Sequence, residues 1–274
     1  LQFIAMNNTG TFQTSWHEYR GEWTHVEGEI IDEALITIYV NGAELATIMA
    51  TPCQQDALAL GFLKNESIIE NLAEVEIVHI SKLGCCVDVW LNHAFQKPER
   101  VIVTSGCGGG VTFSDPRLGL EPIASSAQTN PEVLREQFRK LQPPNSLYAR
   151  SRGVHAAGLL DMEREVLLVV VEDVGRHNTI DKVAGLCLRD GIDSRGKALL
   201  VTGRISSEML RKAARMGCPL VASRTSPTSI SVEMARAWNI TLVGYVRSGR
   251  LRVYSNPERL GDWRDNTGSE LNDN

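Results

Sequence analysis

The spacing of apolar residues changes near the middle of the chain, and it predicts two kinds of architecture. In the first part, apolar and β-branched runs at 30–40 and 43–49 flank Asn41-Gly42, a pair that tolerates positive φ and strongly favours a hairpin. The apolar residues between 57 and 63 predict a helix, and further runs predict strands at 75–80 and 87–91 and a helix from Pro131 to about Leu141. The first part is therefore expected to be a mixed α+β unit.

From residue 154 onward, short apolar runs alternate with helical patterns. Strands are expected at 154–160, 166–171, 198–202, 220–223 and 241–246, and helices near 179–188, 207–216 and 227–238, with Ser226 as a good N-cap for the last helix. Repeated strand–helix units imply a largely parallel sheet. We therefore expect an α/β fold, α+β overall: a smaller mixed domain at 15–145, a larger α/β domain at 146–260 and a disordered tail at 261–274, with Pro143-Pro144-Asn145 at the boundary.

Arginines recur in the loops that follow the predicted strands of the second part, at 175–178, 203–206, 223–226 and 247–250. In an open α/β sheet such loops lie along one edge, beside helix N-termini that attract anions. Planar guanidinium groups also suit bidentate contact with phosphate. A single loop arginine is more often a solvated surface residue, but the repetition predicts an anion-binding crevice.

The charge distribution supports a compact anionic ligand in the second part. Residues 1–100 carry 14 acidic against 5 basic side chains, a net −9, whereas residues 101–274 carry 19 against 23, a net +4. The arginines are interleaved with acids and form no basic run, which argues against nucleic acid as the partner. No apolar run approaches the ~20 residues that span a bilayer, and residues 1–10 lack signal-peptide features, so a cytoplasmic protein without membrane contact is expected.

The six cysteines have neither the density of a disulfide framework nor the CxxC spacing of a zinc site. Cys187 and Cys218 have apolar neighbours and are expected to be buried, whereas the settings of Cys53 and of the Cys85-Cys86 pair leave the question open. Cys107 lies in the polar, glycine-rich stretch 104–110, which is expected to be open and mobile. An exposed cysteine of this kind is the best candidate for thiolate chemistry, although it can also be a bystander in a flexible turn.

Several segments together resemble the signature of the FdhD family, the formate dehydrogenase accessory sulfurtransferases. They are 153–158 (Gly-Val-His-Ala-Ala-Gly), 172–182 (Glu-Asp-Val-Gly-Arg-His-Asn-Thr-Ile-Asp-Lys), 203–209 (Gly-Arg-Ile-Ser-Ser-Glu-Met), 222–229 (Ala-Ser-Arg-Thr-Ser-Pro-Thr-Ser) and 244–250 (Gly-Tyr-Val-Arg-Ser-Gly-Arg). The resemblance runs in consistent order from about Glu29 to about Leu260. It implies a cytidine-deaminase-like fold for the larger domain.

The resemblance also implies a sulfur relay. A cysteine desulfurase would pass persulfide sulfur to Cys107, which would transfer it to a molybdenum or tungsten bis-guanine-dinucleotide cofactor bound as cargo, for the benefit of formate dehydrogenase. A homodimer is expected as well. The residues implied to hold the cofactor are Arg176, His177, Arg204, Ser206, Arg224, Tyr245, Val246, Arg247, Ser248, Gly249 and Arg250.

Deaminase chemistry should not accompany the fold. Where a zinc deaminase has His-x-Glu, the chain has His155-Ala156-Ala157, and it lacks the Pro-Cys-x-x-Cys segment. We therefore expect no metal ligands and no zinc deaminase activity.

The chain departs from the family at one position, because the loop commonly carries Cys-x-x-Cys and residue 110 is glycine. One thiol suffices for a persulfide relay, but the loss leaves a second hypothesis open, a non-catalytic chaperone that delivers the cofactor without sulfur chemistry. Other roles stay open too: His177 can contact phosphate or ribose or cap a helix, and Tyr245 can stack on a base or lie in the core. Asp173 and Asp181 are expected to form salt bridges rather than read a guanine edge.

Overall fold

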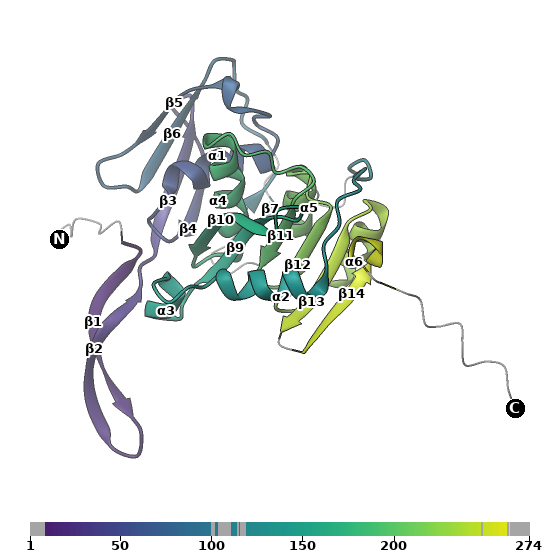
Figure 1. Cartoon of the computed structure of the whole chain (residues 1–274). Helices are drawn as coiled ribbons and strands as arrows, with labels where there is room; N and C mark the ends of the chain where they lie inside the picture. Colours follow the sequence, from purple (N-terminus) through teal and green to yellow (C-terminus); the bar gives the residue numbers. More distant parts are fainter. Residues whose placement is uncertain are drawn as a thin grey trace, which may run out of the picture.

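The largest part of the protein is a six-stranded sheet (Figure 1). The computed structural model describes residues 9–99, 102–103, 111–113, 115, 119–247, 249–261 and 263. The strands of this sheet are β9 (His155–Asp161), β10 (Val166–Asp173), β11 (Ala198–Val201), β12 (Leu220–Ser223), β13 (Thr241–Arg247) and β14 (Arg250–Ser255), in the spatial order β10-β9-β11-β12-β13-β14. Of the five pairings between neighbouring strands, only β11–β12 and β12–β13 are parallel. The prediction of a largely parallel sheet is therefore wrong, because short turns join β9 to β10 and β13 to β14 as antiparallel hairpins.

Helices cover both faces of this sheet, which confirms the mixed α/β class. The helices on one face are α4 (Arg176–Arg189), α5 (Ser207–Arg215) and α6 (Ser229–Ala237), and the helix on the other is α2 (Pro131–Lys140). Leu159 and Val201 pack in the core of the first face, whereas Leu160 and Leu200 pack against α2 in the core of the second. Successive residues of each strand thus serve opposite cores, as the pleat of a β-strand requires.

The first part of the chain forms a four-stranded sheet in the order β4-β3-β6-β5, with one helix, α1 (Gln55–Asn65). Its strands are β3 (Ala34–Val40), β4 (Ala43–Ala50), β5 (Val75–Ile80) and β6 (Cys86–Leu91). Asn41 and Gly42 make the turn of the β3–β4 hairpin with φ of 50° and 76°. The hairpin predicted at this Asn-Gly pair is therefore confirmed.

Helix α1 belongs to the cores of both sheets. Ala57 lies in the core shared with α4, whereas Leu58 and its neighbours lie in the core of the four-stranded sheet. The helices α1 and α4 approach so closely that a Cβ added at Gly61 would collide with the carbonyl of Asp181, and one added at Gly185 would collide with the carbonyl of Ala57. Because backbone lies against backbone here, α1 cannot shift on α4 without opening the core.

A two-stranded arm extends away from both sheets (Figure 1). It consists of β1 (Thr11–Tyr19) and β2 (Trp23–Ile31), paired antiparallel. The strand partner of Trp16 is Val26, and its indole lies over Gly28, where a side chain would collide with the ring. The pattern of hydrophobic runs does not reveal this arm, because its apolar residues alternate with glutamates and histidines.

Several element bounds differ from the sequence prediction. Helix α4 begins at Arg176, three residues before the expected start, so the stretch predicted as a loop is helical. Helix α6 begins at Ser229 with Thr228 as its N-cap, and the predicted cap at Ser226 is wrong. The hydroxyls of Thr228 and Ser231 form a reciprocal capping box, which sets the helix start beyond Pro227.

The segment between the two sheets includes α2, which starts at the predicted Pro131, the short helix α3 (Leu147–Ser151) and the strands β7 (Ile102–Val103) and β8 (Val111–Thr112). Because α2 packs on the six-stranded sheet, residues before 145 already contribute to the larger core; the domain division stays a prediction. No helix in the described part of the chain is long and apolar enough to cross a membrane. Apart from residues 261 and 263, the predicted tail lies outside the described residues.

Candidate functional site

One edge of the six-stranded sheet collects strand ends that are distant in sequence. Since β9 runs antiparallel to both β10 and β11, its first residue His155 lies beside Asp173, the last residue of β10, and at the edge where β11 ends. Val201 ends β11 beside Ser223, the last residue of β12. The Ser223 hydroxyl donates to the Gly203 carbonyl at 2.6 Å, which ties two of the following loops together.

The start of α4 buries two of the predicted cofactor-binding residues. Arg176 and His177 occupy the first turn of the helix and are only 5% and 4% exposed. Asp173 stabilises this turn, because its Oδ1 accepts hydrogen bonds from the Gly175 amide at 2.7 Å and from Asn178 Nδ2 at 2.8 Å. These side chains are therefore built into the fold rather than displayed on a loop.

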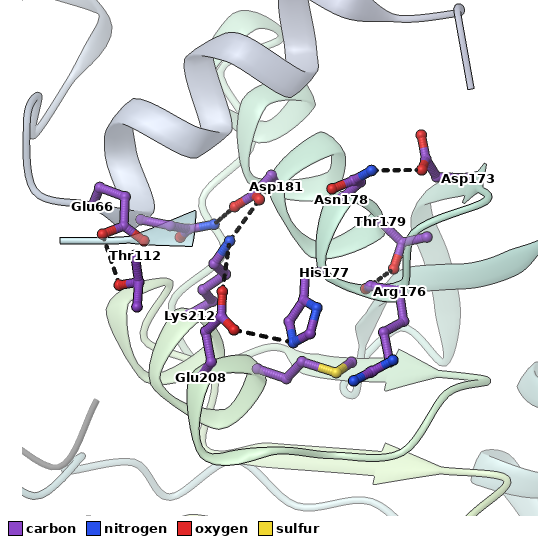
Figure 2. A network of polar contacts seen from close by, with 12 residues as sticks. Glu66, Thr112, Asp173, Arg176, His177, Asn178, Thr179, Asp181, Glu208 and Lys212 are labelled. Atoms are coloured by element: carbon purple, nitrogen blue, oxygen red, sulfur yellow. Dashed lines mark hydrogen bonds and ion pairs between the residues drawn. The ribbon is translucent and has the colours of Figure 1, made fainter. Parts of the chain in front are cut away.

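His177 contacts α5 rather than solvent (Figure 2). Its Nε2 lies 3.2 Å from Glu208 Oε2 and 3.3 Å from the hydroxyl of Ser206, which is also the N-cap of α5. Burial, reinforced by the charges of Lys212 and Arg176, lowers the pKa of His177 to about 3. A neutral ring keeps its contact with the Glu208 carboxylate by carrying its proton on Nε2 and donating it.

Two buried lysines hold the aspartates of this region. Lys182 pairs with Asp173 and Lys212 with Asp181, each at 2.6 Å, and all four side chains are nearly inaccessible to solvent. Lys212 also lies 3.8 Å from Glu208, so it stands between two carboxylates (Figure 2). Burial opposes the charge of Lys212, but Asp181 and Glu208 outweigh it and raise its pKa. The predicted salt bridges of Asp173 and Asp181 are confirmed, with lysines as the partners.

The predicted arginines do not gather in one place, because Arg224 turns to the α2 side of the sheet. Its Nη1 donates to Gln142 Oε1 and its Nη2 to the Phe138 carbonyl, both at 2.7 Å. Arg247 contacts the main chain of Arg224, because its Nε donates to the Arg224 carbonyl at 3.4 Å. Arg204 lies exposed in the loop between β11 and α5.

A basic cavity of about 490 Å³ opens between α2 and the ends of β12 and β13. Its lining residues are Arg135, Phe138, Arg139, Arg224, Val246 and Arg247. None of these described lining residues is acidic, although Oε1 of Glu132, outside the lining, lies 3.9 Å from Nη1 of Arg135. Burial and the nearby charge of Arg247 lower the pKa of Arg224. Guanidinium groups crowded in this way favour an anion between them.

Tyr245, Val246 and Arg247 end β13 and Arg250 begins β14, and Val246 and Arg247 line this cavity. Tyr245 adopts a φ of 55° in a bulge of β13, and its amide donates to the Thr225 carbonyl at 3.1 Å. The guanidinium of Arg252 lies 4.5 Å from the centre of the Tyr245 ring. Arg247 of β13 and Arg250 of β14 are opposite each other in the strand register. Both are exposed, as is Gly249, and Ser248 lies outside the described residues.

Sequence reasoning missed Arg135 and Arg139, which α2 contributes to the cavity. The sequence did contain a signal for this pair, because Arg135 and Arg139 are four residues apart in a predicted helix and residues at that spacing share a face. It also missed Glu208 and Lys212, whose burial depends on how α5 packs against α4. An i, i+4 pair of opposite charge on a helix is usually read as a solvated face, so the sequence offered no distinguishing signal for them.

Cys107 lies outside the described residues, so its proposed role stays a prediction. Cys187 and Cys218 are buried as predicted, and burial raises the pKa of both thiols, for Cys187 to about 12. Cys53 is partly buried with Sγ 3.8 Å from Lys182 Nζ, and burial raises its pKa despite that charge. The Sγ atoms of Cys85 and Cys86 lie 3.8 Å apart. None of these five thiols is exposed, and burial raises the pKa of Cys53, Cys86, Cys187 and Cys218, whereas thiolate chemistry favours an exposed thiol with a lowered pKa.

The described histidines, cysteines, aspartates and glutamates contain no group of three or more that could hold a metal ion. At the start of β9, His155 is followed by Ala156 and Ala157, both fully buried in apolar cores. The expectation about zinc chemistry stays a prediction that rests on these residue types.

Comparisons with known proteins agree with the resemblance in the sequence. The model of the FdhD/NarQ family matches residues 31–261. A Bacillus subtilis protein named sulfur carrier protein FdhD is 34% identical over 251 residues, which cover 89% of this chain and 95% of the relative. A Staphylococcus aureus protein of the same name is 33% identical over 248 residues, covering 88% and 93%.

A solved structure supports the same relationship. A crystal structure described as a formate dehydrogenase accessory protein from Desulfotalea psychrophila superposes with a TM-score of 0.78 at 27% identity. The superposition covers 92% of this chain and 99% of that protein. The family model spans most of the sequence and the relatives align over nearly their whole length, and on that evidence the chain belongs to the FdhD/NarQ family.

Proposed function

We propose that this protein is a sulfur carrier that accepts sulfur from a cysteine desulfurase on Cys107 and delivers it to the molybdenum or tungsten bis-guanine-dinucleotide cofactor of a formate dehydrogenase. The observation that carries the proposal is the family match over residues 31–261, which includes both the Cys107 stretch and the segment 245–250. The other five cysteines are buried or partly buried, which leaves Cys107 as the best candidate for the carrier thiol.

The acceptance step needs only a thiolate and a donor persulfide. The Cys107 thiolate attacks the outer sulfur of the donor, so a new S–S bond forms while the donor's S–S bond breaks and the donor thiolate leaves. The transferred sulfur keeps its oxidation state, and no external oxidant is required. Glycines on both sides of Cys107 allow the main chain many φ/ψ values, which suits a thiol that meets two partners in turn.

The delivery step returns Cys107 to the thiolate. Conversion of the outer sulfur into a sulfido ligand takes two electrons, which a molybdenum(IV) or tungsten(IV) centre in the cargo supplies as it rises to the +6 state. The protein's own contribution is to hold the cargo. The basic cavity suits the pyrophosphate of a guanine dinucleotide, because Arg135, Arg139 and Arg247 line it without an acidic neighbour in the lining.

Intact-mass measurement after incubation with a cysteine desulfurase and cysteine tests the acceptance step. Cys107 should gain one sulfur atom that a reductant removes, and Cys107→Ala should gain none. Cys53→Ala is the matched control, since Cys53 is partly buried and should not be needed for loading. The assignment is wrong if Cys107→Ala still gains the sulfur while Cys53→Ala does not.

A non-catalytic cofactor chaperone is the second candidate, and one observation favours it. Gly110 occupies the place of the family's second loop cysteine, so no neighbouring thiol in this stretch can release the bound sulfur as a loop disulfide. In that case Cys107→Ala would support formate dehydrogenase maturation as well as the unaltered protein does. A maturation assay with this variant therefore separates the two candidates.

A further inference from the structure

We propose that Cys85 and Cys86 form a chelating site for a thiophilic ion, which binds through two protein thiolates and takes its third ligand from solvent. Trivalent arsenic is the ion that fits the site best. The site goes beyond the proposed function, because it uses neither the carrier thiol nor the cavity on the α2 side. It lies in the four-stranded sheet, where the chain turns from β5 into β6.

The turn brings two thiols together although their residues are consecutive in the sequence. Consecutive side chains of an extended strand point to opposite faces. Cys86 is the first residue of β6 and Cys85 directly precedes the strand, and their Sγ atoms lie only 3.8 Å apart. The two thiols therefore share one side of the chain, as a chelating pair must.

Hydrogen bonds hold the main chain of the pair on both sides. The Ser81 hydroxyl accepts from the Cys86 amide at 3.1 Å, and the Ser81 amide donates to the Cys86 carbonyl at 2.9 Å. The Cys85 carbonyl accepts from the Thr37 amide of β3 at 2.8 Å. Chelation then requires only rotations of the two side chains, so little conformational entropy is lost when an ion binds.

Cys86 lies on the face of the four-stranded sheet that α1 does not cover. Val87 and Val89 alternate with Cys86 along β6, and both are fully buried in the core that includes residues of α1. Cys86 therefore points to the other face, as does Trp90, which is 43% exposed. Both thiols are only partly buried, so an ion can reach them without opening the core.

The geometry of the pair does not favour a disulfide. Disulfides usually join residues whose Cα atoms are about 4.4–6.8 Å apart. The peptide between Cys85 and Cys86 is trans, which places their Cα atoms about 3.8 Å apart. A bond between these two sulfur atoms would be strained and easily reduced, so the pair is expected to persist as a dithiol.

The separation of the sulfur atoms fits two bonds to one ion. A bond from a thiolate to an ion of this kind is about 2.3 Å long, as for zinc. Two such bonds at an angle of about 100–110° place the sulfur atoms about 3.5–3.8 Å apart, whereas a linear arrangement would require about 4.6 Å. The 3.8 Å between Cys85 and Cys86 therefore favours an ion with bent rather than linear coordination.

The number of ligands selects among such ions. The described histidines, cysteines, aspartates and glutamates supply no third ligand to the pair, so a tetrahedral zinc ion would lack two protein ligands. Trivalent arsenic is satisfied by two thiolates and one hydroxide in a pyramidal arrangement. Residues 1–100 carry a net charge of −9, which repels anions but not arsenous acid, which is uncharged at neutral pH.

Binding is an exchange of ligands and involves no oxidation. Arsenous acid carries three hydroxyl groups on arsenic. Two As–S bonds form and two As–O bonds break, and the two thiol protons leave with the displaced hydroxyls as two waters. Burial raises the pKa of Cys86, but no free thiolate is needed, because the leaving hydroxyl takes the proton.

The test titrates the full chain, kept reduced by a phosphine, with sodium arsenite and follows intact mass under native conditions. One arsenic should bind with the loss of two waters. Alkylation with iodoacetamide and peptide mapping should then show Cys85 and Cys86 protected in the unaltered protein. Cys85→Ser and Cys86→Ser should each weaken binding by at least about 100-fold, because a single thiol loses the effective concentration that its neighbour provides.

Cys53→Ala is the matched control. Cys53 is partly buried like the pair, but its Sγ contacts Lys182 Nζ, so its replacement should leave the affinity for arsenite unchanged, as should Cys107→Ala. Retained affinity in both pair variants, or protection of other cysteines in place of Cys85 and Cys86, would overturn the assignment. Zn²⁺ should bind more weakly than arsenite, and tighter binding of Zn²⁺ would reveal further protein ligands and refute a site of two thiolates.

Discussion

The two faces of the six-stranded sheet differ in the acidic partners that their basic side chains have. Between α4 and α5, Lys212 lies between Asp181 and Glu208, and the Asp173–Lys182 pair is sealed from solvent. On the α2 side, the arginines that line the cavity have no acidic residue among the described lining residues. Buried carboxylates thus balance the lysines of the first group, whereas the described residues that line the cavity supply no carboxylate to its arginines. The comparison separates charge that maintains the fold from charge that is available to a ligand.

The largest effect should come from breaking the internally balanced group. Lys212→Met leaves Asp181 and Glu208 buried without their counter-charge, so we expect a loss of about 3–5 kcal/mol in the free energy of unfolding, measured by urea denaturation. Lys140→Met is the control, since its pair with Glu136 is exposed and should contribute about 0–1 kcal/mol. Similar losses for the two variants would contradict the assignment of Lys212 to the fold.

Removing charge from the cavity should affect binding instead. Arg135→Ala, Arg139→Ala and Arg247→Ala should each weaken GDP binding by about 1.5–3 kcal/mol where a charge-assisted contact is lost. Isothermal titration calorimetry at two salt concentrations measures both the loss and its screening. Arg195→Ala, which removes an exposed arginine paired with Asp193, should leave the affinity unchanged. Unchanged affinity in all three cavity variants would remove the cavity from the cargo site.

The pH dependence of stability sharpens the comparison further. The pKa of His177 is about 3 in the folded protein, below its unfolded value of about 6.5. Between these values the unfolded chain binds a proton that the native protein does not, so stability falls as the pH falls. From pH 7 to pH 5, His177→Gln should lose about 2 kcal/mol less than the unaltered protein.

Urea denaturation at the two pH values measures that difference, and it isolates the histidine because the neighbours Glu208, Lys212 and Arg176 are retained in both proteins. Parallel losses in the two proteins would mean that His177 is protonated in the native state, paired as an imidazolium with Glu208.

The smallest effect is expected for Arg204, which lies exposed near the start of α5. Arg204→Ala should change the free energy of unfolding by less than about 0.5 kcal/mol. A loss of GDP affinity as large as that of Arg247→Ala would show that the ligand reaches across the sheet edge. No loss would confine the ligand to the α2 side.

The sequence predicted the elements whose pattern is local. The Asn41-Gly42 hairpin, α2 and the alternation of β11, α5 and β12 follow from turn chemistry and apolar spacing. The direction of β9 and β10 does not, since apolar runs of this length look alike in parallel and antiparallel strands. The arm of β1 and β2 has no continuous apolar run, because only one of its faces is apolar.

The candidate site was predictable as a set of residues but not as a geometry. Arg176, Arg204, Arg224 and Arg247 look equivalent in the sequence, because each follows a strand. Whether the side chain meets α4 or α2 depends on helix starts and on partners such as Gln142 that lie far away in the chain.

The contact between Gly61 and Gly185 has a consequence for synthesis of the protein on the ribosome. The four-stranded sheet and α1 leave the exit tunnel long before α4 does, since 116 residues separate Asn65 from its partner Asp181. Until then the face of α1 that will meet α4 has no partner, and an unpaired apolar surface in a nascent chain invites aggregation. The amino-terminal sheet should therefore stay incompletely folded until the second half of the chain is available, which predicts that neither half folds when the two are expressed apart.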